Sequence, residues 1–209
     1  CLLWQAMAAP LSEEQVRQTR ERIIAEAERQ FAASGPDGAS LRSIARALGW
    51  TAASLYRYFP SKEALLAATR AAVLDRFSDR IEAAYASTND LWERSRAVGQ
   101  AYVGFAFEEP HAYRLMFGHA APDPKPPELQ RAEDRSMRTV TDYVEDMIAA
   151  GLLEGDAEAI GRAYWAALHG LIVLRMAGRI GADEFEARRH QTMRLITRGA
   201  RPANLKDNP

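Results

Sequence analysis

The chain has 209 residues, a length typical of one domain or of a small domain joined to a larger one. Apolar residues make up 47% and charged residues 26%, which excludes wholesale disorder, and a net charge of −1 excludes a uniformly basic protein. Alanine is abundant, with 39 residues against 7 valines and 9 isoleucines, and this composition predicts an all-α fold. The single cysteine, Cys1, excludes an intrachain disulfide and fits a reducing cytoplasm.

Neither a membrane span nor a signal peptide is expected. The longest uncharged stretch in the body of the chain, residues 163–174, is about half the ~20 apolar residues that a transmembrane helix needs. The first ten residues lack the basic region of a signal peptide, and Met7 is a candidate for the true start. We therefore expect a cytoplasmic protein.

Helix signals recur along the chain. Ser12 and Gln15 have the spacing of a capping box, and the helix that follows should end where Gly35 precedes Pro36. Cap and breaker signals predict eight further helices, two short ones, a long one and five more, which makes about nine in all. The last of them should begin at a capping box formed by Asp183 and Glu186. Their expected ranges are 41–48, 52–59, 61–87, 89–109, 110–118, 128–150, 156–178 and 183–199. The predicted organisation is a three-helix head at residues 12–60 and a larger helical domain at residues 61–200.

Residues 41–60 carry the pattern of a helix-turn-helix. Ala45 is small where two helices must cross, Gly49 suits a turn with positive φ, and Thr51 can cap the second helix. Trp50 is expected to fill the space between the helices. In such a unit the second helix enters the major groove of DNA.

The polar side chains left over on this segment are hydroxyls and cations, and no acid occurs between residues 40 and 62. These types bind phosphates and base edges, whereas an incidental helical corner would not need them. Arg46 could equally be part of a solvated face. The candidate set is Ser40, Arg42, Thr51, Ser54, Tyr56, Arg57 and Lys62.

The segment ASLRSIARALGWTAASLYRYFPSKEALL resembles the N-terminal signature of TetR-family transcriptional regulators, over about residues 16–67. The resemblance implies that Ala52, Ala53 and Arg57 face the bases. It also implies phosphate contacts for Ser40, Thr51, Ser54, Tyr56 and Lys62. Trp50 departs from the family, which usually has Val there.

Residues 101–175 resemble, more loosely, a C-terminal domain of the same family. The similarity lies in AYVGFAFEEPHAYRLMFG and in a Trp-x-x-x-His-Gly motif at Trp165, His169 and Gly170. Family members dimerise through their last two helices, and many bind a small effector inside the bundle. The resemblance therefore implies a homodimer that binds a palindromic operator in double-stranded DNA.

Aromatic residues and one histidine form the candidate wall of an effector cavity, although most of them could instead be core. His169 either bonds a backbone carbonyl within the core or points into a cavity. With one polar anchor and no cluster of cations, the wall predicts a small, largely apolar effector. The candidate set is Tyr102, Phe105, Tyr113, Phe117, Trp165 and His169.

Catalytic and metal sites are not expected, and neither is a cofactor. The four histidines are scattered, no glycine-rich phosphate loop follows a strand, and Glu108 and Glu109 lie at a helix end where solvation is the simpler interpretation. The function predicted is DNA-binding transcriptional regulation, as a repressor with an effector. The alternative is an effector-independent DNA-architectural or protein-interaction module that uses the same head.

Overall fold

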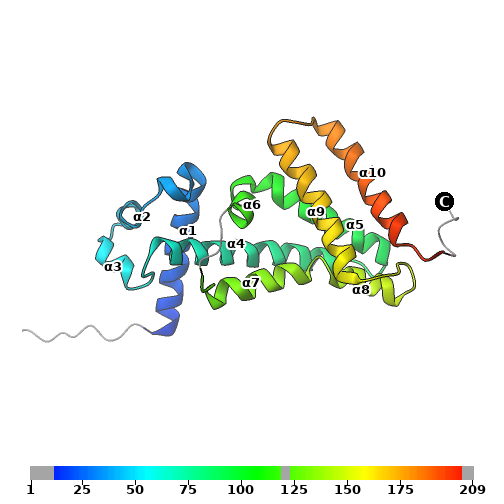
Figure 1. Ribbon diagram of the computed structural model, residues 1–209. Helices are drawn as coiled ribbons and strands as arrows, with labels where there is room; N and C mark the ends of the chain where they lie inside the picture. The colour runs from blue at the N-terminus through cyan, green and yellow to red at the C-terminus, as the bar shows by residue number, and fades with distance from the viewer. Residues whose placement is uncertain (1–11, 119–122, 204–209) are drawn as a thin grey trace, which may run out of the picture. The chain divides into compact units, whose positions relative to one another are not determined.

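The computed structural model describes residues 12–118 and 123–203, and this part of the chain is helical without any strand (Figure 1). The all-α class is confirmed, and no helix there is long and apolar enough to cross a membrane. The signal-peptide question and Met7 lie outside the described residues. The helices are α1 (Glu13–Gly38), α2 (Leu41–Ala47), α3 (Ala52–Tyr56), α4 (Lys62–Tyr85), α5 (Leu91–Glu108), α6 (Pro110–Phe117), α7 (Pro127–Arg138), α8 (Asp142–Ala149), α9 (Ala157–Met176) and α10 (Ala182–Ala200).

The chain forms two compact units that divide within α4, between Ala72 and Val73. Among the described residues, the first unit, called the head below, comprises 12–72 and 123–129. The second unit, called the bundle, comprises 73–118 and 130–203. The sequence places this division at residues 60 and 61. The structure differs because buried residues of the first turns of α4, such as Leu65 and Ala68, belong to the head.

The N-terminal cap of α1 and the break within this helix lie where the sequence predicts them. Ser12 and Gln15 form the expected capping box, and Gly35 interrupts α1 with a φ of 71°. α3 ends at Tyr56, earlier than the expected residue 59. The reason is Pro60, which disfavours helical backbone at Phe59. Phe59 is instead buried beneath the guanidinium of Arg20, 4.3 Å from the ring centre.

α4 carries a different kind of side chain on each of its faces within the bundle. Val73, Phe77 and Ile81 recur at helical spacing and are buried. An acidic row, Asp75, Asp79 and Glu82, binds Arg135 of α7, which donates to Asp79 at 2.6 Å and to Glu82 at 2.5 Å.

A basic row on α4 binds the corner between α5 and α6. Arg76 pairs with Glu109 at 2.7 Å and Arg80 pairs with Glu108 at 2.7 Å. These two acids, for which the sequence indicates simple solvation, are therefore ion-paired. The hydrogen bond from Arg80 lowers the pKa of the exposed Glu108 carboxyl.

An aromatic cluster fills the bundle core. Tyr102 lies edge-on to Phe77, and its hydroxyl is 3.0 Å from that of Tyr113. The Tyr113 hydroxyl is also 2.7 Å from Nδ1 of His169. His169 is therefore satisfied within the protein, but by a tyrosine hydroxyl rather than by a backbone carbonyl. Burial raises the pKa of Tyr102 to about 12 and lowers that of His169.

The single helix expected at 128–150 is divided into α7 and α8. Three consecutive β-branched residues, Thr139 to Thr141, form the break, with backbone hydrogen bonds of the i to i+3 type. The carbonyl of Val140 approaches Gly161 of α9 so closely that an added Cβ would lie 2.4 Å from its oxygen. Only glycine permits this contact.

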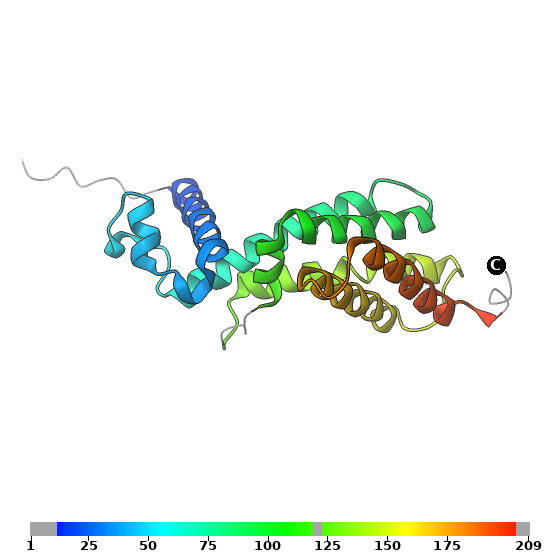
Figure 2. The same ribbon diagram turned by 90° about the horizontal axis from the view of Figure 1, so that it is seen from above.

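The last two helices lie side by side (Figure 1, Figure 2). The N-cap of α9 is Asp156, whose side chain accepts from the Ala159 amide. The expected capping box at Asp183 and Glu186 is wrong, because α10 begins at Ala182 and its N-cap is Gly181, two residues before Asp183. Asp183 lies inside the first turn, where its charge still favours the helix dipole.

Replacing Gly161 by alanine should destabilise the bundle by about 1–3 kcal/mol, since the methyl group would overlap the Val140 carbonyl. Gly99→Ala on α5 is the matched control, because nothing lies within 4 Å of its added Cβ. That control should stabilise the protein by about 0.5–1 kcal/mol. Urea denaturation at one protein concentration measures both. Equal effects for the two variants would contradict the close approach.

The pH dependence of stability should contain a contribution from His169. Its pKa in the folded protein lies below 6.5, so the unfolded chain binds more protons, and stability is lost as pH falls below about 6.5. His169→Asn should therefore lose less stability than the wild type between about pH 7 and pH 5.5. His190→Asn, at an exposed position, is the control. Parallel pH profiles for wild type and His169→Asn would refute this assignment.

Candidate nucleic-acid interface and bundle cavity

The turn between α2 and α3 has the geometry of a helix-turn-helix. Gly49 adopts a φ of 75°, and the Trp50 amide donates to the Ala45 carbonyl at 2.8 Å. Both short helices are capped by hydroxyls, because Ser40 accepts from the Ser43 amide and Thr51 accepts from the Ser54 amide. The turn and the Thr51 cap agree with the sequence prediction, whereas the Ser40 cap was not predicted.

Trp50 occupies a different place from the one expected. Its ring is half-buried and stacks on Tyr58, with ring centres 6.3 Å apart, while the guanidinium of Arg22 lies 5.7 Å above it. The space between α2 and α3 is filled instead by Ile44 and Leu55, both fully buried. The large Trp50 side chain thus braces the turn against α1 from outside.

Most residues of the candidate DNA-binding set lie on the surface of the head. Three are partly buried, namely Ala52, Ser54 and Lys62. The Lys62 ammonium donates to the Ala39 carbonyl at 3.3 Å, which holds it at the start of α4. The exposed members are Ser40, Arg42, Thr51, Ala53, Tyr56 and Arg57.

This surface carries uncompensated positive charge. Arg42, Arg46 and Arg57 are exposed and form no ion pair within residues 12–118 and 123–203. Tyr56 is 54% exposed, so its ring and hydroxyl are accessible to a partner. Hydroxyls, cations and an exposed tyrosine side by side can bind phosphates and base edges.

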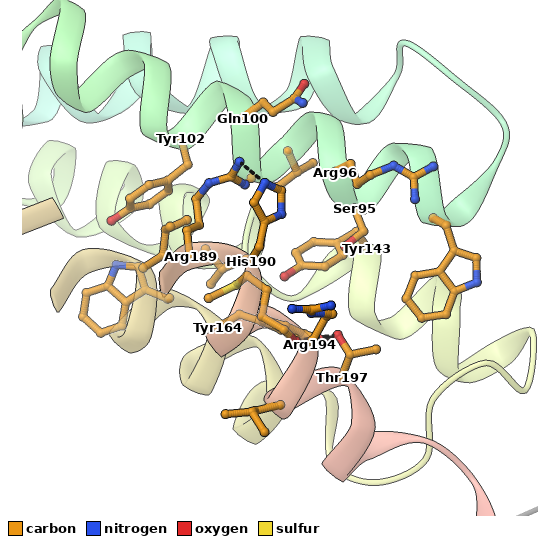
Figure 3. A pocket seen from close by; sticks show the side chains of 18 of the residues that line it. Ser95, Arg96, Gln100, Tyr102, Tyr143, Tyr164, Arg189, His190, Arg194 and Thr197 are labelled. Atoms are coloured by element: carbon orange, nitrogen blue, oxygen red, sulfur yellow. Dashed lines mark hydrogen bonds between the residues drawn. The ribbon is translucent and has the colours of Figure 1, made fainter. Parts of the chain in front are cut away.

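A second candidate site is a cavity of about 690 Å³ in the bundle. Its walls come from α5 and α10, and residues of α8 and α9 complete it, among them Tyr143 and Tyr164 (Figure 3). The Tyr164 hydroxyl bonds that of Thr197 at 2.6 Å, which ties α9 to α10. A volume of this size suits a drug-sized ligand.

Only two members of the expected effector set, Tyr102 and Trp165, line this cavity. Phe105 and Tyr113 are fully buried in the aromatic cluster, so they are core. His169 bonds Tyr113, and Phe117 packs edge-on against His169 with ring centres 4.6 Å apart.

The lining is richer in cations than the sequence analysis expected. Its arginines are Arg96, Arg189, Arg194, Arg198 and Arg201, and His190 lies among them. This cavity therefore differs from the expected wall, which contained no cluster of cations. Helical spacing along α10 was the signal available, since 194, 198 and 201 recur on one face. Among the described residues, no cluster of His, Cys, Asp and Glu could hold a metal ion.

Comparison with protein families covers both units. Residues 23–69 match the family described as bacterial regulatory proteins of the tetR family. Residues 95–198 match the family described as Tetracyclin repressor-like, C-terminal domain. The first match contains the helix-turn-helix, and the second contains most of the cavity lining.

Curated relatives agree with these matches. HTH-type transcriptional regulators of Mycobacterium bovis and Mycobacterium tuberculosis are 31% identical over 144 residues, covering 66% of this chain and 59% of theirs. The nucleoid occlusion factor SlmA of Edwardsiella ictaluri is 30% identical over 105 residues, covering 50% of this chain and 53% of its own. The chain therefore matches less than two thirds of the length of these relatives.

Solved structures share the whole fold. A protein of unknown function from Rhodococcus has a TM-score of 0.78 at 26% identity, covering 95% of this chain and 100% of its own. A TetR family transcription regulator from Marinobacter aquaeolei has a TM-score of 0.67 at 23% identity, covering 88% and 97%. With a helix-turn-helix head and a helical bundle that match the two halves of one family, the chain belongs to the TetR family of transcriptional regulators.

Proposed function

We propose that this protein is a dimeric transcriptional repressor that binds a near-palindromic operator and releases it in response to a small molecule bound in the bundle. The observation that carries the proposal is the exposed, acid-free face of α2, the turn and α3. α3 acts as the recognition helix, and the hydroxyls around it anchor phosphates.

Direct readout falls mainly to Arg57. Ala52 and Ala53 have no hydrogen-bonding side chain, so they contribute contacts with thymine methyl groups. Arg57 is exposed at the end of α3, where a guanidinium can reach both acceptors of a guanine. The side chain of Lys62 ends in a single ammonium group, held near the start of α4, and this group binds a DNA phosphate.

Dimerisation through α9 and α10 is supported by exposed apolar side chains on α9. Val173 is 45% exposed and Leu174 is 44% exposed, in a helix with no acid between residues 159 and 176. Small residues at 163, 166 and 170 line the same helix at helical spacing, which lets a second helix approach closely. Two such helices per subunit would form a four-helix interface.

Coupling between ligand and operator would pass through α4, which contributes residues to both the head and the bundle. A ligand can lower operator affinity only as far as it prefers the state that does not bind DNA. A hundredfold loss of operator affinity requires about a hundredfold preference of that kind.

The alternative function is an effector-independent DNA-bound module. The alternative is supported by the similarity to relatives that are named nucleoid occlusion factors rather than transcriptional regulators. The two functions differ in one measurable property. A repressor of the proposed kind loses operator affinity when a ligand occupies the bundle, and the alternative does not.

Arg57→Ala should weaken cognate operator binding by about 1–3 kcal/mol and relax preference at one base pair per half-site, with little effect on scrambled DNA. Lys62→Ala should weaken both DNAs alike and reduce the salt slope by about one per half-site, since it removes one phosphate contact. Fluorescence anisotropy at several salt concentrations measures both.

Arg179→Ala is the control for net charge, because this exposed arginine lies in the bundle. Equal weakening of cognate and scrambled DNA by Arg57→Ala would make Arg57 a phosphate contact. Specificity would then have to come from DNA shape and from methyl contacts.

The protein should sediment as a dimer at micromolar concentration, and Val173→Glu should shift it toward monomer by placing charge in an apolar interface. Ala83→Glu, an exposed position on α4, adds the same charge elsewhere and should remain dimeric. A wild-type monomer, or a dimer unaffected by Val173→Glu, would refute the α9 interface. Analytical ultracentrifugation distinguishes these outcomes.

A further inference from the structure

We propose that the bundle cavity binds a small organic anion, whose charged group lies between the arginines of α5 and α10 and whose apolar body lies against the aromatic lining. This inference rests on the proposed function, because it names the chemical class of the effector. The opposed walls are shown in Figure 3, with Arg96 on α5 and Arg189 and Arg194 on α10.

The charged side chains that line the cavity are all basic. No Asp or Glu occurs among the lining residues, and Arg96, Arg194 and Arg198 form no ion pair within the described part of the chain. Arg189 is compensated by Glu186 at 2.6 Å, and Arg201 stacks on Trp92 at 5.6 Å. Unpaired cations around a concave site concentrate anions and repel cationic ligands.

The interior of the cavity adds a neutral donor to these cations. Tyr143 lines it, is 6% exposed, and forms no hydrogen bond with the described residues. Burial raises the pKa of its hydroxyl, so the group stays protonated and can donate. The neighbouring Tyr164 hydroxyl is already bonded to Thr197. Tyr143 is therefore the free donor that a carboxylate or sulfonate can use.

Aromatic rings supply the rest of the recognition. Tyr102, Tyr143, Tyr164 and Trp165 give the cavity flat apolar surfaces, and its volume of about 690 Å³ exceeds what an inorganic ion requires. Arginine binds oxyanions such as carboxylates through two parallel hydrogen bonds and also stacks on rings. An aromatic or aliphatic body that ends in an oxyanion fits both features at once.

Two fluorescent probes test this directly, because they differ by one sulfonate. They are 8-anilinonaphthalene-1-sulfonate and its uncharged counterpart N-phenyl-1-naphthylamine, each titrated into the full chain. We expect one saturable site per protomer for the sulfonate. Arg194→Gln and Arg198→Gln should each weaken the sulfonate about tenfold, as expected for loss of a charged hydrogen bond, and change the uncharged probe less than twofold.

Arg179→Gln is the matched control, since it removes an exposed charge that does not line the cavity. It should leave the affinity for both probes unchanged. Thermal denaturation and sedimentation of each variant establish that fold and assembly are intact. Tyr143→Phe should weaken the sulfonate several-fold through loss of one donor, with the uncharged probe again unaffected.

Three outcomes would overturn the proposal. One is the absence of saturable sulfonate binding, as expected if a second chain fills the cavity. Another is equal weakening of both probes by Arg194→Gln, which would indicate an apolar surface alone. The third is sulfonate binding that no arginine variant changes. If the arginines control sulfonate affinity but the sulfonate leaves operator affinity unchanged, the anion site stands and the effector part of the proposed function fails.

Discussion

The bundle depends on how α4 distributes its charge. Asp75, Asp79 and Glu82 recur on one face of the helix, so they would repel one another unless a cation lies between them. Arg135 fills that position from α7, and its pKa is raised by the carboxylates of Glu82 and Asp79. Much of this network is solvent-exposed, so it contributes little to the free energy of folding. Its effect is to determine which face of α7 packs against α4.

The opposite charge pattern holds the other side of the same helix. Arg76 and Arg80 pair with Glu109 and Glu108 at the corner that opens α6, where Pro110 is the first helical residue. The buried face between the two charged rows packs on the aromatic cluster through Phe77. A shift of α4 would therefore disturb ion pairs on two faces and edge-to-face rings on a third, which suits a helix proposed to transmit a signal.

The polar chain from Tyr102 through Tyr113 to His169 crosses three helices, α5, α6 and α9. Buried hydroxyls need partners, so each ring fixes the rotamer of the next. Tyr102 of this chain of hydrogen bonds also lines the cavity, and so does Trp165, whose ring stacks on His169. A ligand there would touch the core through these two side chains.

Local chemistry alone determined the helix-turn-helix: Gly49 for positive φ, Ser40 and Thr51 as caps, and the apolar spacing that buries Ile44 and Leu55. Each of these depends on neighbours within a few residues. The sequence did not predict the division at Thr139–Thr141, where the Val140 carbonyl packs against Gly161, or the start of α10 at Ala182. The cavity was decided by tertiary structure only. Arg96 and Arg194 each have the sequence appearance of a solvated surface residue, and their common role arises because α5 and α10, distant in the chain, face one space.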